Sequence, residues 1–301
     1  SNRELIMPNF LDIKDLSSDQ IVKIIDIAHK WKIEKAPSFL GDKNIMMIFE
    51  KPSLRTRVSF EVCIKQLGGD VTVFNSSEFA LGERESVFDT AKVLERYVDM
   101  IIVRTFDHSI LSEFASIINV PVINALTDFS HPCQVIADLL TIKEHFKSFK
   151  NKKISWFGDC NNVTQSWIEA SVLLGINFYV ACPKTVLPNS ETLKWIKSNN
   201  GNVIFSEDTT LVAKEADCIL TDTWVSMGDK KNKSIEDFFP FQVNKNIMKI
   251  AKDNAMFLHC LPVHRDKEVT KEVIDGTSSF IYDQAENRLH AQKSIISYCF
   301  D

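Results

Sequence analysis

The chain has 301 residues, of which 45% are hydrophobic and 25% are charged, values close to those of ordinary globular proteins. The formal net charge of −5, from 35 basic and 40 acidic residues, argues against nucleic acid or a membrane surface as the main partner. A chain of this length predicts two domains, each large enough to bury its own core.

Short runs rich in β-branched residues alternate with longer amphipathic segments along almost the whole chain. From the N-terminus, strands are predicted at residues 44–49, 70–74, 99–103, 121–124, 153–157, 176–181, 202–205, 217–220 and 255–258. Helices are predicted at residues 17–35, 54–67, 86–97, 109–118, 132–148, 162–174, 190–199, 244–252 and 284–300. This alternation is typical of βαβ units. It predicts the α/β class, with two domains that are each a parallel-rich, doubly wound sheet flanked by helices.

The domain boundary is predicted at the polar end of the helix at 132–148, where charged and polar residues separate two apolar strands. The first domain is expected to span residues 1–148 and the second residues 149–283. The last segment, residues 284–301, has a helical pattern and is expected to pack back on the first domain.

Seven cysteines are scattered through the chain without a CxxC pair. This usage is typical of a reducing compartment and indicates neither a disulfide framework nor a zinc ribbon. No apolar run approaches the roughly 18 residues of a membrane span. We therefore expect a cytoplasmic protein.

The strongest chemical signal follows the first predicted strand, at Ser53-Leu54-Arg55-Thr56-Arg57, where a helix is predicted to begin. A helix N-terminus offers unpaired N–H groups and a partial positive charge, and the hydroxyl and guanidinium groups add directional donors. The dipole contributes only about 0.3–1 kcal/mol at an exposed site, so the arginines must supply most of the affinity. The segment predicts a site for a multiply charged anion, and a polar helix cap with solvated arginines is the alternative.

Polar residues also follow later strands of the first half. Arg104 directly follows the predicted strand at 99–103, and the segment His131-Pro132-Cys133-Gln134 comes after the next predicted strand. Proline suits the first turn of a helix, so His131 and Gln134 are predicted at a helix entrance, where they can donate to a carbonyl or phosphate oxygen. A surface ion pair for Arg104 and a structural hydrogen bond for His131 remain open from these residues alone.

Two loops of the second half carry further polar side chains. The segment from Asp159 to Asn162 leads into a predicted helix and is also consistent with a helix cap. The segment from Asp222 to Gly228 combines a carboxylate, hydroxyls, a large aromatic ring and glycine. That mixture suggests a binding loop, although a surface loop that covers the core would look similar.

A third loop, His259-Cys260-Leu261-Pro262, follows the last predicted strand. Adjacent side chains on extended backbone point in opposite directions, so His259 is not expected to act as the base for Cys260. No other His/Cys spacing supports zinc. A polar role for Cys260 is therefore favoured over a covalent one.

Taken together, these segments resemble the aspartate/ornithine transcarbamoylase family, and within it the members that use ornithine as the acceptor. The family's Ser-Thr-Arg-Thr-Arg corresponds to residues 53–57, its His-Pro-x-Gln to 131–134, its Asp-x-Trp-x-Ser-Met-Gly to 222–228, its His-Cys-Leu-Pro to 259–262 and its Glu-Asn-Arg to 286–288. The likeness runs in order from about residue 8 to the end of the sequence. It implies transfer of the carbamoyl group of carbamoyl phosphate to the side-chain amine of L-ornithine, giving L-citrulline and phosphate, as in arginine biosynthesis.

The resemblance also implies which residues contact each substrate. Carbamoyl phosphate is expected to contact Ser53, Leu54, Arg55, Thr56, Arg104, His131, Gln134, Cys260, Leu261 and Arg288. Ornithine is expected to contact Asn162, Asp222, Ser226 and Met227. The catalytic roles are expected for Arg55, Arg104, His131, Asp222 and Cys260. Neither a metal nor an organic cofactor is expected, because carbamoyl phosphate is already activated.

Two positions depart from the family's pattern. Leu54 replaces a threonine, although a contact through its backbone N–H would survive. Ala80 replaces a glutamine that in the family reaches the carbamoyl phosphate of a neighbouring subunit, and Arg84 is a candidate replacement. The resemblance otherwise implies a homotrimer, or a multiple of trimers, with neither nucleic acid nor a membrane as a partner.

Two alternatives remain open. The acceptor could be a related amine, such as putrescine or N-acetylornithine. The second alternative is a non-catalytic anion or amino-acid sensor on the same fold, which Ala80 favours.

Overall fold

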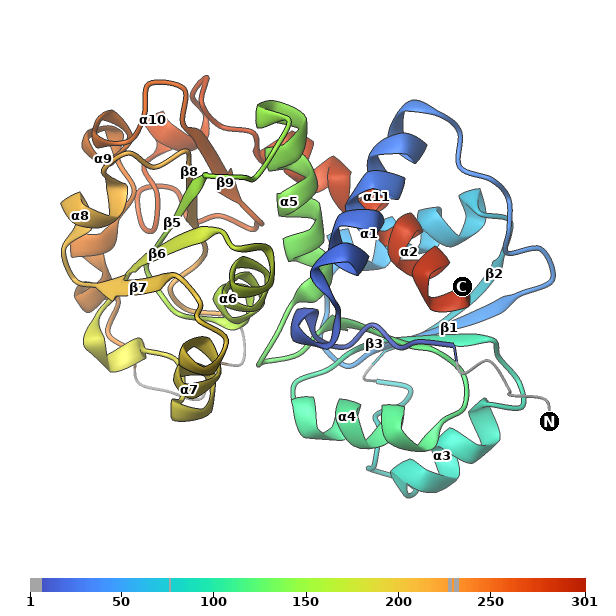
Figure 1. The fold of residues 1–301 in the computed structure, drawn as a ribbon. Coiled ribbons are helices and arrows are strands. Elements are labelled where there is room, and N and C mark those ends of the chain that lie inside the picture. Colours follow the sequence, from blue (N-terminus) through green and yellow to red (C-terminus); the bar gives the residue numbers. More distant parts are fainter. Residues whose placement is uncertain (1–6, 76, 227–228, 230–232) are drawn as a thin grey trace. The chain divides into compact units, whose positions relative to one another are not determined.

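The computed structural model describes residues 7–75, 77–226, 229 and 233–301 (Figure 1). The chain forms two compact units: unit 1 comprises Ser1–Leu140 and Asn287–Asp301, and unit 2 comprises Thr141–Glu286. Both boundaries lie inside helices, α5 (Pro132–Phe146) and α11 (Ile281–Phe300). The boundaries were expected after residues 148 and 283 and lie eight residues earlier and three residues later, respectively. Polar composition marks the end of a helix, whereas packing decides which core each turn joins.

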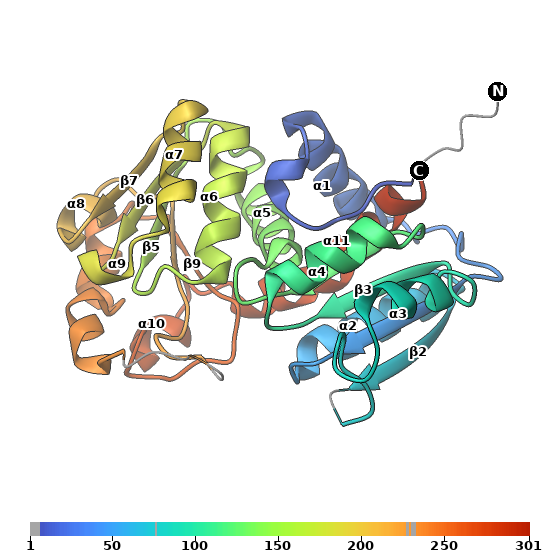
Figure 2. The same ribbon diagram turned by 90° about the horizontal axis from the view of Figure 1, so that it is seen from below.

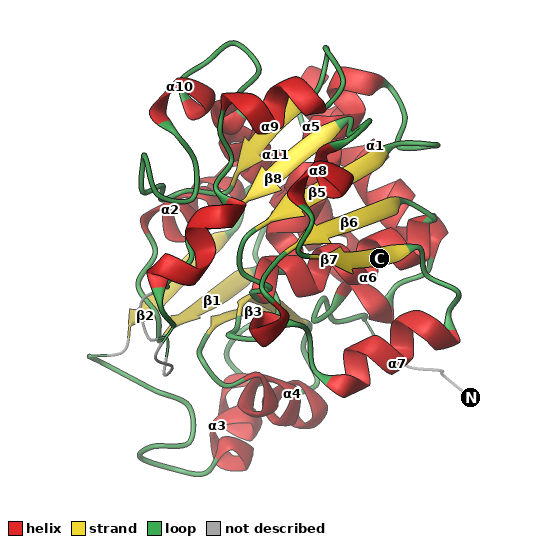
Figure 3. Cartoon of the chain, turned by 90° about the vertical axis from the view of Figure 1, so that its left-hand side faces the viewer, coloured by secondary structure: helices red, strands yellow, loops and turns green. Residues whose placement is uncertain are grey.

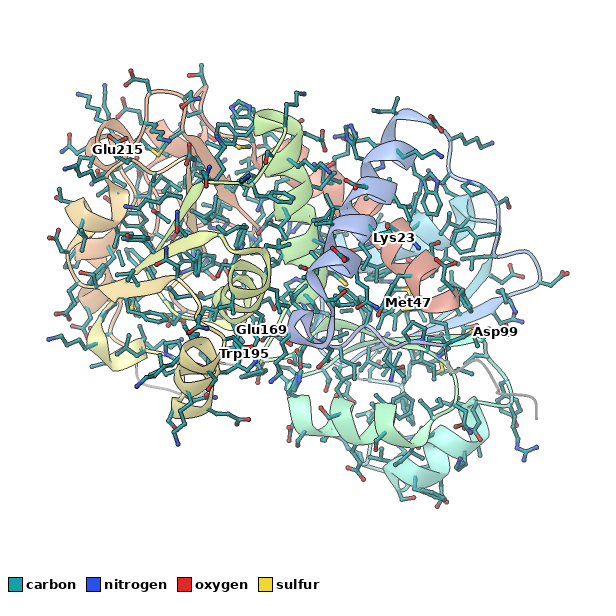
Figure 4. The ribbon with its side chains drawn as sticks, viewed as in Figure 1. Lys23, Met47, Asp99, Glu169, Trp195 and Glu215 are labelled. Atoms are coloured by element: carbon teal, nitrogen blue, oxygen red, sulfur yellow. The ribbon has the colours of Figure 1, made fainter. Side chains whose placement is uncertain are left out.

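Unit 1 is built on a four-stranded parallel sheet in the order β2-β1-β3-β4. Its strands are β1 (Asn44–Phe49), β2 (Asp70–Asn75), β3 (Met100–Arg104) and β4 (Val122–Leu126). The three strands β1, β3 and β4 are almost entirely buried, whereas the edge strand β2 is only partly buried. Met47, in the middle of β1, is fully buried, while Asp99 lies before β3 and is only half-buried (Figure 4). Burial on both faces explains why these strands read as continuous apolar runs.

Helices cover both faces of the unit 1 sheet (Figures 1 and 2). They are the short 3₁₀ helix η1 (Ile13–Asp15), α1 (Ser18–Ile33), α2 (Leu54–Gln66), α3 (Val87–Leu94) and α4 (His108–Ile117). One face packs against α3 and α4 in a core that includes Ile48, Val103 and Phe114. The helices α1, α2 and α11 lie on the opposite face.

Unit 2 is built on a five-stranded parallel sheet in the order β7-β6-β5-β8-β9 (Figure 3). Its strands are β5 (Lys153–Phe157), β6 (Asn177–Ala181), β7 (Val203–Ser206), β8 (Cys218–Thr221) and β9 (Met256–His259). The predicted α/β class, with two parallel sheets flanked by helices, is confirmed. All the strands lie within a residue or two of the predicted ranges.

The helices of unit 2 are α6 (Asn162–Leu174), α7 (Ser190–Ser198), α8 (Thr209–Ala213), α9 (Lys245–Ile250) and α10 (Lys271–Ile274), with the 3₁₀ helices η2 (Lys184–Val186) and η3 (Ile235–Phe241). The helices α8, α9 and α10 share one core with β5, β8 and β9. On the other face, Trp167 of α6 stacks on Phe178 of β6 with ring centroids 5.7 Å apart. The short helices α8, α10 and η3 were not predicted, because a helix of one or two turns is too short to show periodicity.

Within the described residues, no helix has the length and apolar character needed to cross a membrane.

Parallel pairing brings the carboxyl ends of neighbouring strands to one edge of each sheet. In unit 1, the segments that leave β1, β3 and β4 at this edge begin at Glu50, Thr105 and Thr127. In unit 2, the segments that leave β5 and β8 begin at Gly158 and Asp222. The polar segments found in the sequence therefore lie at the ligand-binding edge of each sheet.

Gly158 brings the segments after β5 and β8 close together. Its φ of 114° lies in a region that residues with a side chain rarely adopt. A Cβ atom at this position would lie 3.0 Å from Nε1 of Trp224. Trp224 is buried and stacks on Phe238 with ring centroids 5.8 Å apart. The position therefore requires glycine for both its backbone conformation and its contact with the indole ring.

We predict that Gly158→Ala lowers the free energy of unfolding by about 2–4 kcal/mol, because it adds backbone strain and a contact with Trp224. Gly175→Ala is the matched control, since Gly175 also has a positive φ, 68°, but nothing lies within 4 Å of the position that a Cβ atom would take there. The control should lose only about 1 kcal/mol. Urea denaturation of both variants measures the difference, and equal losses would contradict the role given to Trp224.

Candidate active site

In unit 1, two arginines converge on the hydroxyl group of Thr56. Nη1 of Arg104 donates to Oγ1 of Thr56 at 3.3 Å, and Nη2 of Arg288 donates to the same oxygen at 3.1 Å. Thr56 lies in the first turn of α2, Arg104 ends β3 and Arg288 lies on α11. All three side chains are at least nine-tenths buried. The structure thus gathers two cations at the N-terminus of a helix.

Amide side chains hold the Arg288 guanidinium in place. Its Nη1 donates to Oε1 of Gln134 at 2.8 Å, and its Nε donates to Oε1 of Gln292 at 3.2 Å. Gln292 in turn donates to Ser59 of α2 at 2.9 Å. Gln134 was predicted as a site residue, whereas Gln292 was missed, because one amide in a polar helix gives no distinctive pattern. These bonds fix the direction in which Arg288 can offer its remaining donors.

The convergence of these cations carries an electrostatic cost. Both guanidinium groups bind one hydroxyl, so their two donor nitrogens are at most about 6 Å apart, and the cations repel by roughly 2–3 kcal/mol at an effective dielectric constant near 20. A neutral hydroxyl does not offset this repulsion, whereas an anion bound beside it would. The helix N-terminus adds further attraction for negative charge. The arrangement therefore suits a phosphorylated or otherwise multiply charged ligand.

His131 and Lys51 belong to the same cluster of charges. His131 directly precedes α5 and is buried. Burial, followed by the charges of Arg288, Arg104 and Lys51, holds the pKa of His131 well below its usual value of 6.5. Its imidazole is therefore neutral at pH 7 and can donate one hydrogen bond without adding a charge. Lys51 was missed in the sequence, although it stands directly before the anion-binding segment.

The remaining residues of this segment lie at the start of α2. Ser53 is its N-cap, and its hydroxyl accepts the N–H of Thr56 at 3.3 Å. Arg55 is half-buried in the first turn, and no partner for its side chain occurs among the residues that the structure describes. Leu54 exposes its side chain, which leaves only its backbone N–H to serve the site. Arg57 points away and pairs with Glu61 at 3.4 Å on the exposed face of α2, so the second arginine of the segment is not part of the cluster.

The loop around Ala80 is tied to the end of β1. The N–H of Leu81 donates to Oε1 of Glu50 at 2.6 Å, and the hydroxyl of Thr105 donates to the other oxygen of that carboxylate. Glu50 follows β1 directly, and Thr105 follows Arg104. Glu50 therefore fixes this loop to the strand ends that carry the cluster, a role that the sequence did not indicate.

In unit 2, the segments after β5 and β8 are joined by Asn161 and Asp222. Nδ2 of Asn161 donates to Oδ2 of Asp222 at 2.6 Å, and the other carboxylate oxygen accepts the N–H of Thr223 at 2.7 Å. The side-chain oxygen of Asn161 caps α6 by accepting two backbone N–H groups of its first turn. Asn162, the predicted ornithine contact, is half-buried at the start of α6. The helix cap thus also orients the carboxylate predicted to bind the amino acid.

Three side chains of unit 2 lie close enough together to suggest a metal site. One ligand atom each of Asp222, His259 and Cys260 lies within 4.8 Å of the others. However, Nδ1 of His259 accepts the N–H of Leu261 at 2.8 Å, so its Nε2 carries the proton and donates to Glu268 at 2.8 Å. His259 therefore has no lone pair left for a metal ion or for the Cys260 thiol. These hydrogen bonds, rather than the direction of the side chains, keep His259 from acting as a base.

The other predicted residues of unit 2 lie in loops. Cys260 is half-buried, and Leu261 has a φ of 62°, which is uncommon for a residue with a branched side chain. The N–H of Ser226 donates to Oδ2 of Asp229 at 2.9 Å. Met227 lies outside the described residues.

Unit 1 thus offers a cationic site at a helix N-terminus, and unit 2 offers an oriented carboxylate at the ends of its strands. An α/β chain with these two sites has the features of an enzyme that acts on a phosphorylated substrate and an amine.

Comparisons with known proteins place the chain within this class. Residues 8–144 match the family model described as the carbamoyl-P binding domain of aspartate/ornithine carbamoyltransferase. The model of the Asp/Orn binding domain of the same family matches residues 150–299. The chain belongs to the aspartate/ornithine carbamoyltransferase family.

Individual relatives agree over nearly the whole length. The ornithine carbamoyltransferase of Nitrobacter winogradskyi is 45% identical over 297 residues, which cover 97% of this chain and 96% of that protein. Among solved structures, the ornithine carbamoyltransferase of Pyrococcus furiosus has a TM-score of 0.92 and 42% identity, with 97% of both chains covered. The anabolic enzyme of Campylobacter jejuni has a TM-score of 0.91 and 35% identity, with 98% of this chain and 99% of that chain covered.

We predict that His131→Asn reduces the loss in free energy of unfolding that occurs when the pH is lowered from 7.5 to 5.5. Because the pKa of His131 is lowered in the native state, the unfolded chain binds a proton that the native state does not bind, and stability falls as the pH drops below about 6.5. By pH 5.5, one unit below the usual pKa of histidine, this single group should account for about 1 kcal/mol of lost stability. Urea denaturation at pH 7.5 and pH 5.5 should therefore show a smaller loss in the variant. An equal loss in the wild type and the variant would contradict the neutral state of His131.

Proposed function

We propose that this chain transfers the carbamoyl group of carbamoyl phosphate to the side-chain amine of L-ornithine, giving L-citrulline and phosphate. The observation that carries the proposal is the convergence of Arg104 and Arg288 on Thr56 at the N-terminus of α2. In this proposal, unit 1 binds carbamoyl phosphate and unit 2 binds ornithine. The descriptions of the two matching family models support this division.

Carbamoyl phosphate combines a phosphate group with a carbonyl group, and unit 1 offers groups suited to each. The backbone N–H groups at Ser53 and Leu54, with the side chains of Arg55 and Arg104, would hold the phosphate oxygens. Thr56, His131, Gln134 and Arg288 would bind the carbamoyl part. A neutral His131 suits this role, because it donates a hydrogen bond to the carbonyl oxygen without competing for the phosphate.

Ornithine would be bound through its α-amino and α-carboxylate groups. Asp222 is the natural partner for the α-ammonium group, and Asn162, Ser226 and Met227 would complete the contacts. A carboxylate held by Asn161 at 2.6 Å keeps its direction, so the amino acid would bind in one orientation. Cys260 and Leu261 would lie near the reacting carbamoyl group.

The reacting amine must be neutral in order to attack. A lysine-like ammonium has a pKa near 10.4, so its neutral form costs about 4.6 kcal/mol at pH 7. A desolvated site near guanidinium groups lowers this cost, because both effects disfavour a second cation. Asp222 would raise the pKa of any ammonium beside it, which is a further reason to assign it to the α-amino group, or to proton transfer with Cys260.

The reaction would then proceed as an acyl transfer. The neutral amine attacks the carbonyl carbon and forms the new C–N bond, and the carbonyl oxygen becomes an oxyanion that Arg55, Thr56 and His131 stabilise. The C–O bond to phosphate then breaks, the phosphate leaves with the electron pair, and the amine nitrogen gives up its proton to the departing phosphate. Arg55 and Arg104 neutralise the departing phosphate. No metal or organic cofactor is required, because phosphate is already a good leaving group.

We also propose that the protein acts as a homotrimer, or a multiple of trimers, in the cytoplasm and in arginine biosynthesis. Exposed apolar side chains support an assembly: Leu54 and Val58 on α2 and Phe88 and Val93 on α3 are unusually accessible for residues of their type. The scattered free cysteines support a reducing compartment.

The acceptor can be tested with one purified sample. Formation of citrulline, carbamoylputrescine and N-acetylcitrulline from carbamoyl phosphate and each amine should be compared by mass spectrometry. We predict that kcat/KM for ornithine exceeds that for either other amine by at least about 100-fold. A poorer amine would leave polar groups of the site without hydrogen-bond partners, and each such group costs free energy. A preference for putrescine or N-acetylornithine would reassign the acceptor, and binding of carbamoyl phosphate without any product would favour a sensor.

The anion site can be tested with Arg55→Ala. We predict that kcat/KM falls by at least about 10²–10³-fold, because the variant loses a charged donor to the phosphate and the oxyanion. Arg57→Ala is the matched control, since Arg57 lies two residues away in the same helix but pairs with Glu61 on its exposed face. Circular dichroism should show that both variants remain folded. Near-normal activity of Arg55→Ala would contradict the assignment of this site.

A further inference from the structure

Lys233 lies among carboxylates at the strand ends of unit 2. Its Nζ is 2.6 Å from Oδ2 of Asp159 and 3.2 Å from Oδ2 of Asp229. Asp159 follows β5 and its side chain is only 5% exposed, while the side chain of Lys233 is 19% exposed. This is therefore a largely buried ion pair between residues that are 74 positions apart in the chain. A solvent-exposed ion pair, by contrast, contributes little to stability.

The same carboxylates connect Lys233 to both segments that the proposed function assigns to ornithine. Oδ2 of Asp229, which contacts Lys233, also accepts the N–H of Ser226 at 2.9 Å. On the other side, Asp159 stands two residues before Asn161, which binds Asp222. The ammonium group of Lys233 thus links the segment after β5 with the segment after β8.

The charges show why a cation is needed at this position. Burial raises the pKa of Asp159, the charges of Asp229 and Asp222 raise it further, and Lys233 opposes these effects. Burial disfavours the charged form of Lys233, but Asp159 and Asp229 outweigh this and raise the pKa of the lysine. Without the ammonium group, three carboxylates would repel one another, and the two segments would move apart.

We propose that Lys233 is a positioning residue for the amino-acid substrate: it holds Ser226 and Asp222 in the geometry that binds ornithine, without touching the reacting atoms. The inference rests on the proposed function and extends it to a residue that is not among the substrate contacts expected from the family resemblance. Because Lys233 acts on the unit 2 site, its removal should affect ornithine and leave carbamoyl phosphate almost unaffected.

Steady-state kinetics of the full chain test the proposal. Lys233→Met keeps the length of the side chain and removes its charge. We expect the KM for ornithine to rise about 10–100-fold and the KM for carbamoyl phosphate to change less than about twofold. Lys233→Arg should recover most of the affinity for ornithine, because it restores the charge. Lys194→Met, at an exposed position on α7, is the matched control and should leave both constants unchanged.

Asp159→Asn removes the other partner of the ion pair, and it replaces Lys233→Met as the test if that variant fails to fold. It should also raise the KM for ornithine, and the effects of Asp159→Asn and Lys233→Met should be less than additive in the double variant. A wild-type chain that forms citrulline, with an unchanged KM for ornithine in Lys233→Met, overturns this inference alone. A wild-type chain that forms no citrulline overturns the proposed function and this inference with it.

Discussion

The site of unit 1 depends on holding two guanidinium groups against one hydroxyl. Arg104 and Arg288 both donate to Thr56, and like charges at this separation repel each other. The fold keeps them there because Arg104 ends a buried strand and Arg288 is bound by Gln134 and Gln292 on packed helices. Donors held in this way do not have to reorganise when an anion arrives, and electrostatic stabilisation of a transition state depends on such preorganisation.

Unit 2 presents the opposite charge pattern. Asp159, Asp222 and Asp229 stand near the ends of β5 and β8, and Lys233 is the cation that offsets them. A site with an excess of negative charge suits an amino group, just as the cationic site of unit 1 suits a phosphate. In the proposed function, the two units would therefore divide the two substrates by charge, which is consistent with the descriptions of the two matching family models.

Hydrogen-bond partners also decide which titratable groups can take part in chemistry. The buried His259 uses both ring nitrogens, one to accept from Leu261 and one to donate to Glu268, and is thereby a structural residue. His131 is also buried, but burial and the neighbouring cations together lower its pKa, and it lies within their cluster. The same type of side chain thus holds a loop in unit 2 and lies beside cations in unit 1, according to its neighbours.

The sequence by itself determined the α/β class, the positions of the strands along the chain and most of the segments that follow the strand ends. Strand 44–49 was predicted with its observed bounds, because burial and backbone preference are local properties that a short apolar run records. Local patterns do not record contacts such as that between Arg288 and Thr56, which are 232 residues apart. For that reason Gln292 and Glu50 were missed, and only the tertiary structure showed that Arg57 points away from the site. The sequence specifies which side chains are available, whereas packing between distant segments decides which of them meet.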